Sequence, residues 1–336
     1  MILYSLNDLR KLVTQVFVNS KTSQKNSKFV ADALVKAEAD GLKSHGLARV
    51  ESYAAQSISG KVDGFATPAL KQLKSGACQV DANSGFAYPA IDLGLSWSLK
   101  RVGTSGLVGL GISNSHHAGV LGHHVERIAD AGFIGLGFSN SPSALGPWGG
   151  DKALYGTNPI AFSCPRRGQK PLIVDLSMSK VARGKIMIAA KNGEKIPKDW
   201  AVDKDGKQTT DADAALAGTM LPFGEAKGAA LTLIVEMLAA TLTGSNYGYE
   251  ATSFFSGEGN PPAIGQFFII IDPNIFGNGE FEFRVETLMQ AILAQAGTRL
   301  PGQRRFKIRE NSEKIGIKVS DEMILNFRNR AKNFLT

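Results

Sequence analysis

The sequence lacks the two commonest nucleotide-binding signatures. No GxGxxG segment follows an apolar run, and no GxxxxGK[ST] segment occurs in the 336 residues. A Rossmann dinucleotide fold and a P-loop therefore fail their simplest sequence test. A nucleotide, if one binds, is held by a different fold.

Cysteine and long apolar runs are also scarce. Cys78 and Cys164 lie far apart and no CxxC occurs, so zinc and redox motifs are unsupported and both thiols are expected to be reduced core residues. The N-terminal segment has no apolar region of a signal peptide. The longest apolar stretch contains Glu236 and is too short to span a bilayer. We therefore expect a cytoplasmic protein with no membrane partner.

The excess of positive charge is spread over the chain. Lys and Arg number 38 against 30 Asp and Glu, giving a formal net charge of +8. A nucleic-acid-binding protein typically gathers such charge in a stripe with aromatic residues between the cations, and this sequence has no such stripe. A small anionic ligand explains the charge as well, and a basic, non-enzymatic nucleic-acid-binding protein is kept as a distant alternative.

Apolar periodicity predicts an α/β protein with helices at both ends. Ser5 and Asp8 form a capping-box pattern, a second helix over 28–40 should stop at Gly41, and a third covers 47–58. The first sixty residues are thus expected to be helical, with one loop at 42–46. Short strands and helices then alternate, and the last helices are expected over 281–297 and 319–335. The predicted boundaries are a helical region 1–62, an α/β core 63–280 with 118–212 as a candidate subdomain, and C-terminal helices 281–336 that pack on the first region.

All five histidines fall in two short segments. His45 lies in a Ser-His-Gly tripeptide, and the others are His116, His117, His123 and His124. Histidine is the side chain best suited to proton transfer near neutral pH. For His123 and His124, on a predicted helix, satisfied structural histidines are the favoured interpretation. A metal site is not predicted, because adjacent helical residues face different directions.

His45 and Arg49 are spaced by four residues and can share one face of a helix. Reduction of a 2-oxo acid needs a proton donor at the carbonyl and a cation for the carboxylate, and imidazole and guanidinium supply these. From spacing alone, capping or surface roles for both residues are an equal alternative.

Other polar residues allow two interpretations each. Asp175 ends an apolar strand and could orient an imidazole or cap a helix near Ser177 or Ser179. Several Lys and Arg residues lie where they could bind phosphate groups, although a solvated charged surface is the commoner explanation of such residues. These cations are Lys180, Arg183, Lys185, Lys227, Arg304 and Arg305.

Seven segments, in order over about 260 residues, together resemble the malate/L-lactate dehydrogenase-like family, also called type-2 malate/lactate dehydrogenases. That family includes Δ1-piperideine-2-carboxylate reductases and sulfolactate dehydrogenases. The segments are DGLKSHGLARVESY, ISNSHHAG, GTNPIAF, VDLSMSKVARGK, IPKDWAVDKDGKQTTD, PFGEAKGAALTLIVEMLA and RLPGQRR.

The resemblance implies a non-Rossmann cofactor-binding fold, with a largely antiparallel sheet wrapped by helices, and a homodimer. It implies His45 as proton donor with Ser44 and Asp175 as relay partners, and Arg49 and Thr157 at the substrate. It also implies a set of cofactor-binding residues: His116, His117, Ser177, Ser179, Lys227, Arg304 and Arg305, the last two in a loop.

One departure bears on the substrate. Malate and lactate members commonly carry a glycine- and histidine-containing segment where this chain has FGEAKGAA, with Glu225 in place of those residues. The leading hypothesis is therefore an NAD(P)H-dependent reductase of Δ1-pyrroline-2-carboxylate and Δ1-piperideine-2-carboxylate, or of an equivalent 2-oxo acid. A malate or L-lactate dehydrogenase is the alternative. Glu225 could stabilise an iminium cation, or simply cap a helix or face solvent. The basic residues favour NADPH, with NADH as the alternative cofactor.

Overall fold

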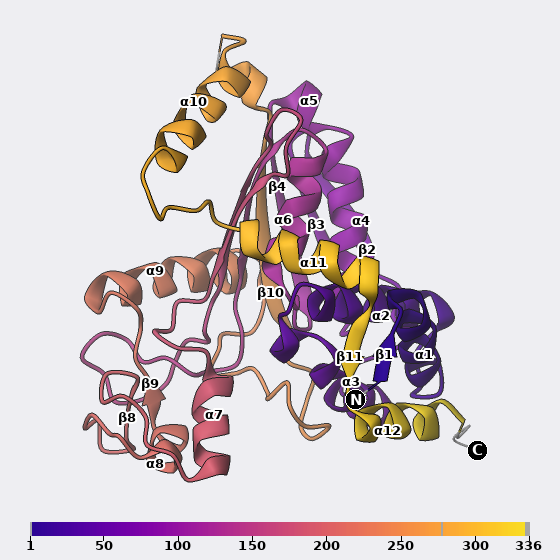
Figure 1. Cartoon of the computed structure of the whole chain (residues 1–336), viewed down its shortest axis with the longest axis vertical. Coiled ribbons are helices and arrows are strands. Elements are labelled where there is room, and N and C mark those ends of the chain that lie inside the picture. Colours follow the sequence, from indigo (N-terminus) through magenta and orange to yellow (C-terminus); the bar gives the residue numbers. More distant parts are fainter. Residues whose placement is uncertain (1, 277, 333–336) are drawn as a thin grey trace.

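The computed structural model describes residues 2–276 and 278–332, and a mixed sheet forms the middle of that part (Figure 1). Its strands are β2 (Ala69–Lys74), β3 (Ala77–Asp81), β4 (Leu107–Ser115), β5 (Ile134–Ser139), β6 (Ile160–Cys164), β7 (Leu172–Leu176) and β10 (Ile264–Ile271). The order is β2-β3-β4-β10-β5-β6-β7, and among these neighbours only β3 and β4 are parallel. The predicted largely antiparallel α/β sheet is confirmed.

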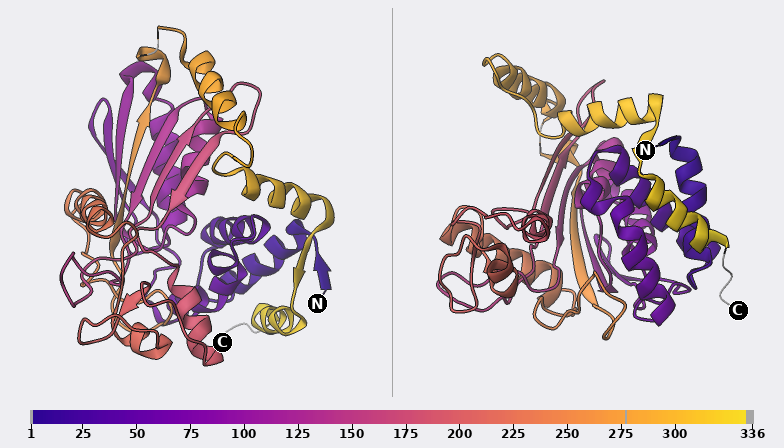
Figure 2. Two further views of the ribbon diagram at one scale, coloured as in Figure 1. Left: turned by 60° about the vertical axis from the view of Figure 1, so that its left-hand side comes forward. Right: turned by 60° about the horizontal axis from the view of Figure 1, so that its bottom comes forward.

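Helices cover both faces of this sheet (Figure 2). On one face, α4 (Ala87–Leu99) and α6 (Leu121–Asp130) bury apolar side chains against β3, β4 and β10, and the short α5 (Val102–Ser105) leads into β4. On the other face, α9 (Ala226–Glu236) continues into a π-helical segment, Met237–Thr241. Val235 and Ala239 from that continuous helix pack against Phe138 of β5.

The N-terminal helices form a second core. They are α1 (Leu6–Val18), α2 (Gln24–Ala39) and α3 (Val50–Ser59). The Asp8 N–H donates to Oγ of Ser5 at 3.1 Å, which confirms the capping prediction, and Gly41 has the expected left-handed backbone with φ +76°. Leu9, Val13 and Leu34 are fully buried in this core.

The expectation that the first sixty residues are helical was wrong in one place. Residues Ile2–Tyr4 form β1, which pairs antiparallel with β11 (Ile317–Val319). Its partner lies more than three hundred residues away, so no local pattern could reveal the pairing. The expected loop at 42–46 also contains a 3-10 turn, Lys43–His45, followed by a second one, Leu47–Arg49.

Part of the C-terminal region packs on the N-terminal helices. The last helix, α12 (Asp321–Lys332), lies against α1, and the Asn19 side chain donates to the carbonyls of Arg330 and Ala331 at 3.1 and 2.7 Å. α11 (Gln303–Ile315) crosses α2, whereas α10 (Phe281–Leu293) lies at the far end of the sheet (Figure 1). The prediction that Arg304 and Arg305 lie in a loop was wrong. Both are in the first turn of α11, a polar helix without a clear apolar period.

Residues 144–223 build a smaller apolar cluster beside the sheet, at the lower left of Figure 1. It contains α7 (Arg183–Asn192), α8 (Ala212–Ala217) and the two-residue strands β8 (Ala201–Val202) and β9 (Thr219–Met220). Leu145, Met178 and Ile186 are fully buried in it. Among the helices of the described residues, none is long and apolar enough to cross a membrane.

Candidate active site

The Ser-His-Gly turn is held in place by a carboxylate of α2. Oε2 of Glu38 accepts a hydrogen bond from the Leu47 N–H at 3.0 Å, just after the turn. A Cβ atom on Gly46 would lie only 3.0 Å from the Cα atom of Glu38, so this position requires glycine. The turn therefore presents His45 at a fixed place between α2 and α3.

His45 lies within a small group of polar and aromatic side chains. Oγ of Ser44 is 3.0 Å from its Nδ1, which brings together the pair that the resemblance implied. Its ring centroid is 5.4 Å from that of His117. Burial lowers the pKa of His45 to about 4, and the positive charge of Arg49 contributes in the same direction. His45 is therefore neutral at neutral pH in the free protein.

Arg49 presents an unsatisfied cation to this group. Its Nε donates to the Ser44 carbonyl at 2.7 Å, and its guanidinium carbon lies 4.4 Å from the centre of the Phe255 ring. Nη1 is buried without a hydrogen-bond partner, and no ion pair to Arg49 occurs within the described residues. Buried donors are nearly always paired in folded proteins, so this N–H indicates a place for an external acceptor. A carboxylate matches the guanidinium in charge and geometry.

The histidine pair of the SHHAG segment forms the adjoining wall. The Tyr53 hydroxyl is hydrogen-bonded to Nδ1 of His117, and burial raises the pKa of Tyr53 to about 12. Tyr53 therefore stays protonated at neutral pH and is a neutral hydrogen-bond partner of His117. The Phe254 ring lies 5.2 and 4.9 Å from the rings of His116 and His117. Sequence reasoning assigned no role to Tyr53, Phe254 or Phe255, because no local motif marks an aromatic wall built from distant segments.

Asp175 lies in a different set of contacts. Its Oδ2 accepts from the Gly122 N–H at 2.9 Å and lies 3.5 Å from Nη1 of Arg305. Burial raises the pKa of Asp175, and the charge of Arg305 opposes that shift. Within the described chain, no hydrogen bond or ion pair joins Asp175 to His45 or Ser44. Its part in a relay stays a prediction.

The remaining substrate and cofactor candidates lie on connected backbone. The Thr157 N–H donates to Oγ of Ser141 at 3.1 Å, and its carbonyl accepts from the Met178 N–H at 2.7 Å. Oγ atoms of Ser177 and Ser179 are 3.0 Å apart, so they flank Met178 beside Thr157. Their roles stay predictions.

Lys227 and Glu225 lie at the start of α9, where the sequence placed them. Both side chains are exposed in the single chain. Glu225 has a left-handed backbone, with φ +55°, and its side chain makes no capping hydrogen bond. No contact within the described residues joins it to His45 or Arg49.

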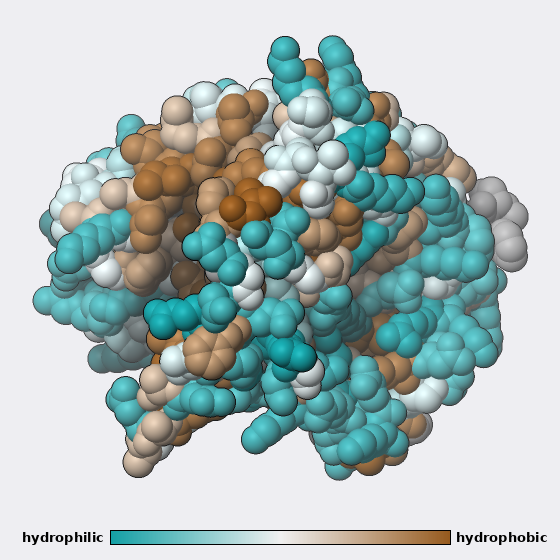
Figure 3. All heavy atoms as spheres, turned by 90° about the horizontal axis from the view of Figure 1, so that it is seen from above, coloured by the Kyte–Doolittle hydropathy of each residue, from teal (hydrophilic) through white to brown (hydrophobic). Residues whose placement is uncertain are grey.

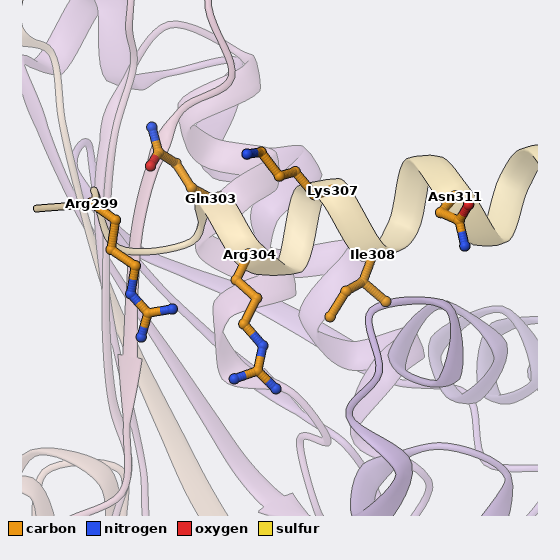
Figure 4. Close-up of a pocket in the computed structure, with 6 residues that line it drawn as sticks. All are labelled: Arg299, Gln303, Arg304, Lys307, Ile308 and Asn311. Atoms are coloured by element: carbon orange, nitrogen blue, oxygen red, sulfur yellow. The ribbon is translucent and has the colours of Figure 1, made fainter. Parts of the chain in front are cut away.

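The two arginines of α11 face different surroundings. Arg304 lines a cavity of about 400 Å³ together with Arg299 and Lys307. In the view of Figure 4, Arg299 and Arg304 extend to the same side of the helix. Arg305 instead lies 3.7 Å from Oδ2 of Asp40. The cavity thus gathers three cations, a donor set that fits the phosphates of a nicotinamide dinucleotide.

Comparison with known proteins matches residues 4–327 to the family model described as malate/L-lactate dehydrogenase. The chain belongs to the malate/L-lactate dehydrogenase family. The resemblance inferred from the sequence is confirmed, and membership makes the protein an oxidoreductase.

Relatives within this family differ in the substrates that their names give. The chain is 50% identical to a (2R)-3-sulfolactate dehydrogenase (NADP(+)) of Chromohalobacter salexigens over 83% of each protein. It is 37% identical to a Δ1-pyrroline-2-carboxylate reductase of Ancylobacter novellus, over 94% of this chain and 93% of the relative. The structure of Δ1-piperideine-2-carboxylate reductase from Pseudomonas syringae superposes with a TM-score of 0.93 at 35% identity, covering 98% of this chain and 100% of that one.

The histidines of this family member should all be neutral at pH 6, because burial disfavours imidazolium. Burial lowers the pKa of His45, His123 and His124 to about 4 and that of His116 to about 3, and it lowers the pKa of His117 well below its ordinary value. Imidazole proton NMR of the free protein should therefore show no titration near pH 6.5, the ordinary value. Adding a saturating small carboxylate should raise the pKa of His45, since an anion beside Arg49 stabilises imidazolium. A His45 signal that titrates near pH 6.5 without ligand, or that ignores the carboxylate, would contradict this geometry.

Proposed function

We propose that the protein reduces a small cyclic imine carboxylate, Δ1-pyrroline-2-carboxylate or Δ1-piperideine-2-carboxylate, at C2 with NADPH. The observation that carries this proposal is the buried, unpartnered Nη1 of Arg49 beside His45. Relatives named as reductases of these two imines, at 37% identity, support the choice of substrate.

Each group of the site has a distinct task in this proposal. Arg49 binds the substrate carboxylate through Nη1, while its Nε stays on the Ser44 carbonyl. This fixes C2 close to His45, which in its protonated form donates a proton to the substrate nitrogen. The bound cofactor supplies the hydride to C2. Binding of the carboxylate also offsets the repulsion between Arg49 and a protonated His45, so protonation of His45 costs less when substrate is present.

The composition of the site favours a monoanionic ring over a dianion. One unpaired cation, Arg49, faces a wall formed by Phe254, Phe255 and the His117 ring. A ring-shaped apolar body fits such a wall, whereas a second acidic group would be desolvated without a partner. The aromatic wall, and not Glu225, is therefore the structural support for an imine substrate, because Glu225 is exposed and has no contact with His45 or Arg49 within the described residues.

A 3-sulfolactate dehydrogenase is the second candidate, favoured by the relative with that name at 50% identity. Its substrate, like malate, carries two acidic groups and needs a second cation. Arg183 at the start of α7 is half-buried and has no acidic partner among the residues described, so it is the cation that could serve. L-Lactate carries one acidic group, and pyruvate, its oxidised form, is tested beside the others.

One substrate panel separates these activities. We expect kcat/KM for the two cyclic imines to exceed that for 3-sulfopyruvate, oxaloacetate and pyruvate by at least about tenfold, an energy difference of roughly 1.4 kcal/mol at the transition state. NADPH oxidation followed by absorbance measures all five. A clear preference for 3-sulfopyruvate would overturn the imine assignment and establish the second candidate.

The proposed cofactor-binding residues are those that the resemblance implied, and their cations fit the NADPH preference. Arg304 lines the basic cavity with Arg299 and Lys307 (Figure 4). Lys180 already pairs with Asp199, which makes it a weaker candidate for the 2′-phosphate. The relative named as NADP(+)-dependent supports the same choice. We therefore assign the 2′-phosphate to the Arg304 cavity.

Replacement of Arg304 tests this assignment. Arg304→Met should raise KM for NADPH roughly tenfold and leave KM for NADH nearly unchanged, because a charge-assisted hydrogen bond to the 2′-phosphate is lost. Lys314→Met, an exposed cation in the last turn of the same helix, is the matched control and should change neither constant. An equal rise for both cofactors, or none, would remove the 2′-phosphate from this cavity.

We infer that two copies associate in the cytoplasm. The resemblance implies a homodimer, and the exposed apolar side chains of one long helical segment are otherwise left in water. These are Leu231, Leu233, Ile234, Met237 and Leu242. Figure 3 shows apolar side chains gathered at the upper left of its view. A second copy of this chain is the occupant that we propose for this surface.

A further inference from the structure

We propose that Lys61 is a positioning residue that holds residues 251–259, here called the aromatic loop, against the site and thereby orients Arg49. The inference rests on the proposed role of Arg49 as the carboxylate clamp. It assigns a function to a buried lysine that lies outside every motif discussed above.

Lys61 is a buried cation committed to one loop. The side chain belongs to a residue that is only 2% exposed, and its Nζ donates to the carbonyls of Ser253, Ser256 and Glu258 at 2.6, 3.2 and 2.8 Å. An ammonium has three N–H donors, so all of them are used by the aromatic loop. Three carbonyls converging on one charge fix the path of the loop as a bound metal ion would.

A second set of contacts fastens the same loop to α3. Gln56 donates from Nε2 to the Phe254 carbonyl at 2.8 Å, and its Oε1 accepts from Nε2 of His116 at 3.0 Å. A Cβ atom on Gly257 would lie 3.0 Å from the Ala55 carbonyl oxygen. The loop backbone therefore lies directly on the helix that follows Arg49.

The loop delivers two rings to the site. Phe254 contacts His116 and His117, and the Phe255 ring centre lies 4.4 Å from the guanidinium carbon of Arg49. Phe255 is 51% exposed, so burial alone does not hold its ring there. Stacking restricts the plane of the guanidinium, and with Nε fixed by Ser44 it directs Nη1 toward the substrate. Without the contacts of Lys61, the Phe255 ring is held less firmly and the plane of the guanidinium is less restricted.

Burying a lysine without a carboxylate at hydrogen-bond distance carries a desolvation cost. A purely structural position would be filled as well by an apolar side chain of similar length. Methionine cannot donate hydrogen bonds to the three loop carbonyls, and the proposal depends on these hydrogen bonds.

The test compares Lys61→Met with Lys61→Arg and Lys21→Met. Lys21 also donates to a carbonyl of α3, that of Ile58 at 3.0 Å, but within the described residues no hydrogen bond joins its side chain to the aromatic loop. Lys61→Met should raise KM for the carboxylate substrate roughly tenfold, with kcat within about threefold and KM for NADPH unchanged. Lys61→Arg, which keeps charge and donors, should recover most of the loss, and Lys21→Met should behave as wild type.

A double-mutant cycle identifies the ring as the intermediary. If Lys61 acts through Phe255, the Lys61→Met, Phe255→Ala double variant should be no worse than Phe255→Ala alone. Additive effects, or equal losses for both substrates and cofactor, would overturn the proposal. If Lys61→Met does not fold, Gly257→Ala moves the loop from the other side and should raise the same KM selectively; an unchanged KM would then overturn it.

The substrate for these measurements is whichever carboxylate the wild type reduces fastest. A different preferred substrate therefore contradicts the proposed function and leaves the test of Lys61 intact.

Discussion

The site depends on a buried guanidinium nitrogen that nothing in the described chain satisfies. Leaving part of a buried cation without a partner costs several kcal/mol in a folded protein. The Ser44 carbonyl and the Phe255 ring offset part of that cost for Arg49, but Nη1 still lacks a hydrogen-bond acceptor. A substrate carboxylate can therefore form a strong, directional, charge-assisted hydrogen bond with this N–H group. His45 beside it is neutral, because burial disfavours its protonation and the charge of Arg49 opposes protonation further.

A second set of buried charges differs from Arg49 because each of its charged groups is paired with a group of opposite charge. The Arg309 guanidinium bridges Asp40 and Glu126, with Nη2 at 2.7 and 2.9 Å from one oxygen of each. Burial alone would raise the pKa of Asp40, but hydrogen bonds from Arg309 and His123 outweigh it and lower that pKa to about 2. These contacts tie α2, α6 and α11 together. They hold the turn carrying His45 at a fixed distance from the helix that carries Arg304.

Local patterns predicted what local contacts determine. The capping box at Ser5 and the end of α2 at Gly41 follow from periodicity and turn chemistry, and both are confirmed. The four-residue spacing predicted that His45 and Arg49 could share a face, and the structure brings Arg49 onto the backbone of the Ser-His-Gly turn. The non-Rossmann cofactor-binding fold was predicted from the family motifs and not from composition.

Contacts between distant segments were not predictable in this way. The pairing of β1 with β11, the aromatic loop beside Arg49, and the convergence of Lys61 on that loop each join segments about two hundred residues apart or more. α11 was missed because its apolar positions are few, so no period marks the helix. The role of Asp175 stays a prediction, since the motif implies a partner for His45 and the described contacts of Asp175 are with Gly122 and Arg305.

The most direct test of the account is the ratio of kcat/KM for a substrate carboxylate to that for its uncharged carboxamide, in wild type and in Arg49→Met. A buried charge pair truncated on one side typically loses about 2–5 kcal/mol, so the wild type should prefer the carboxylate by roughly a hundredfold and Arg49→Met should lose most of that preference. A variant that keeps the wild-type ratio would show that the carboxylate binds elsewhere and would contradict the central claim.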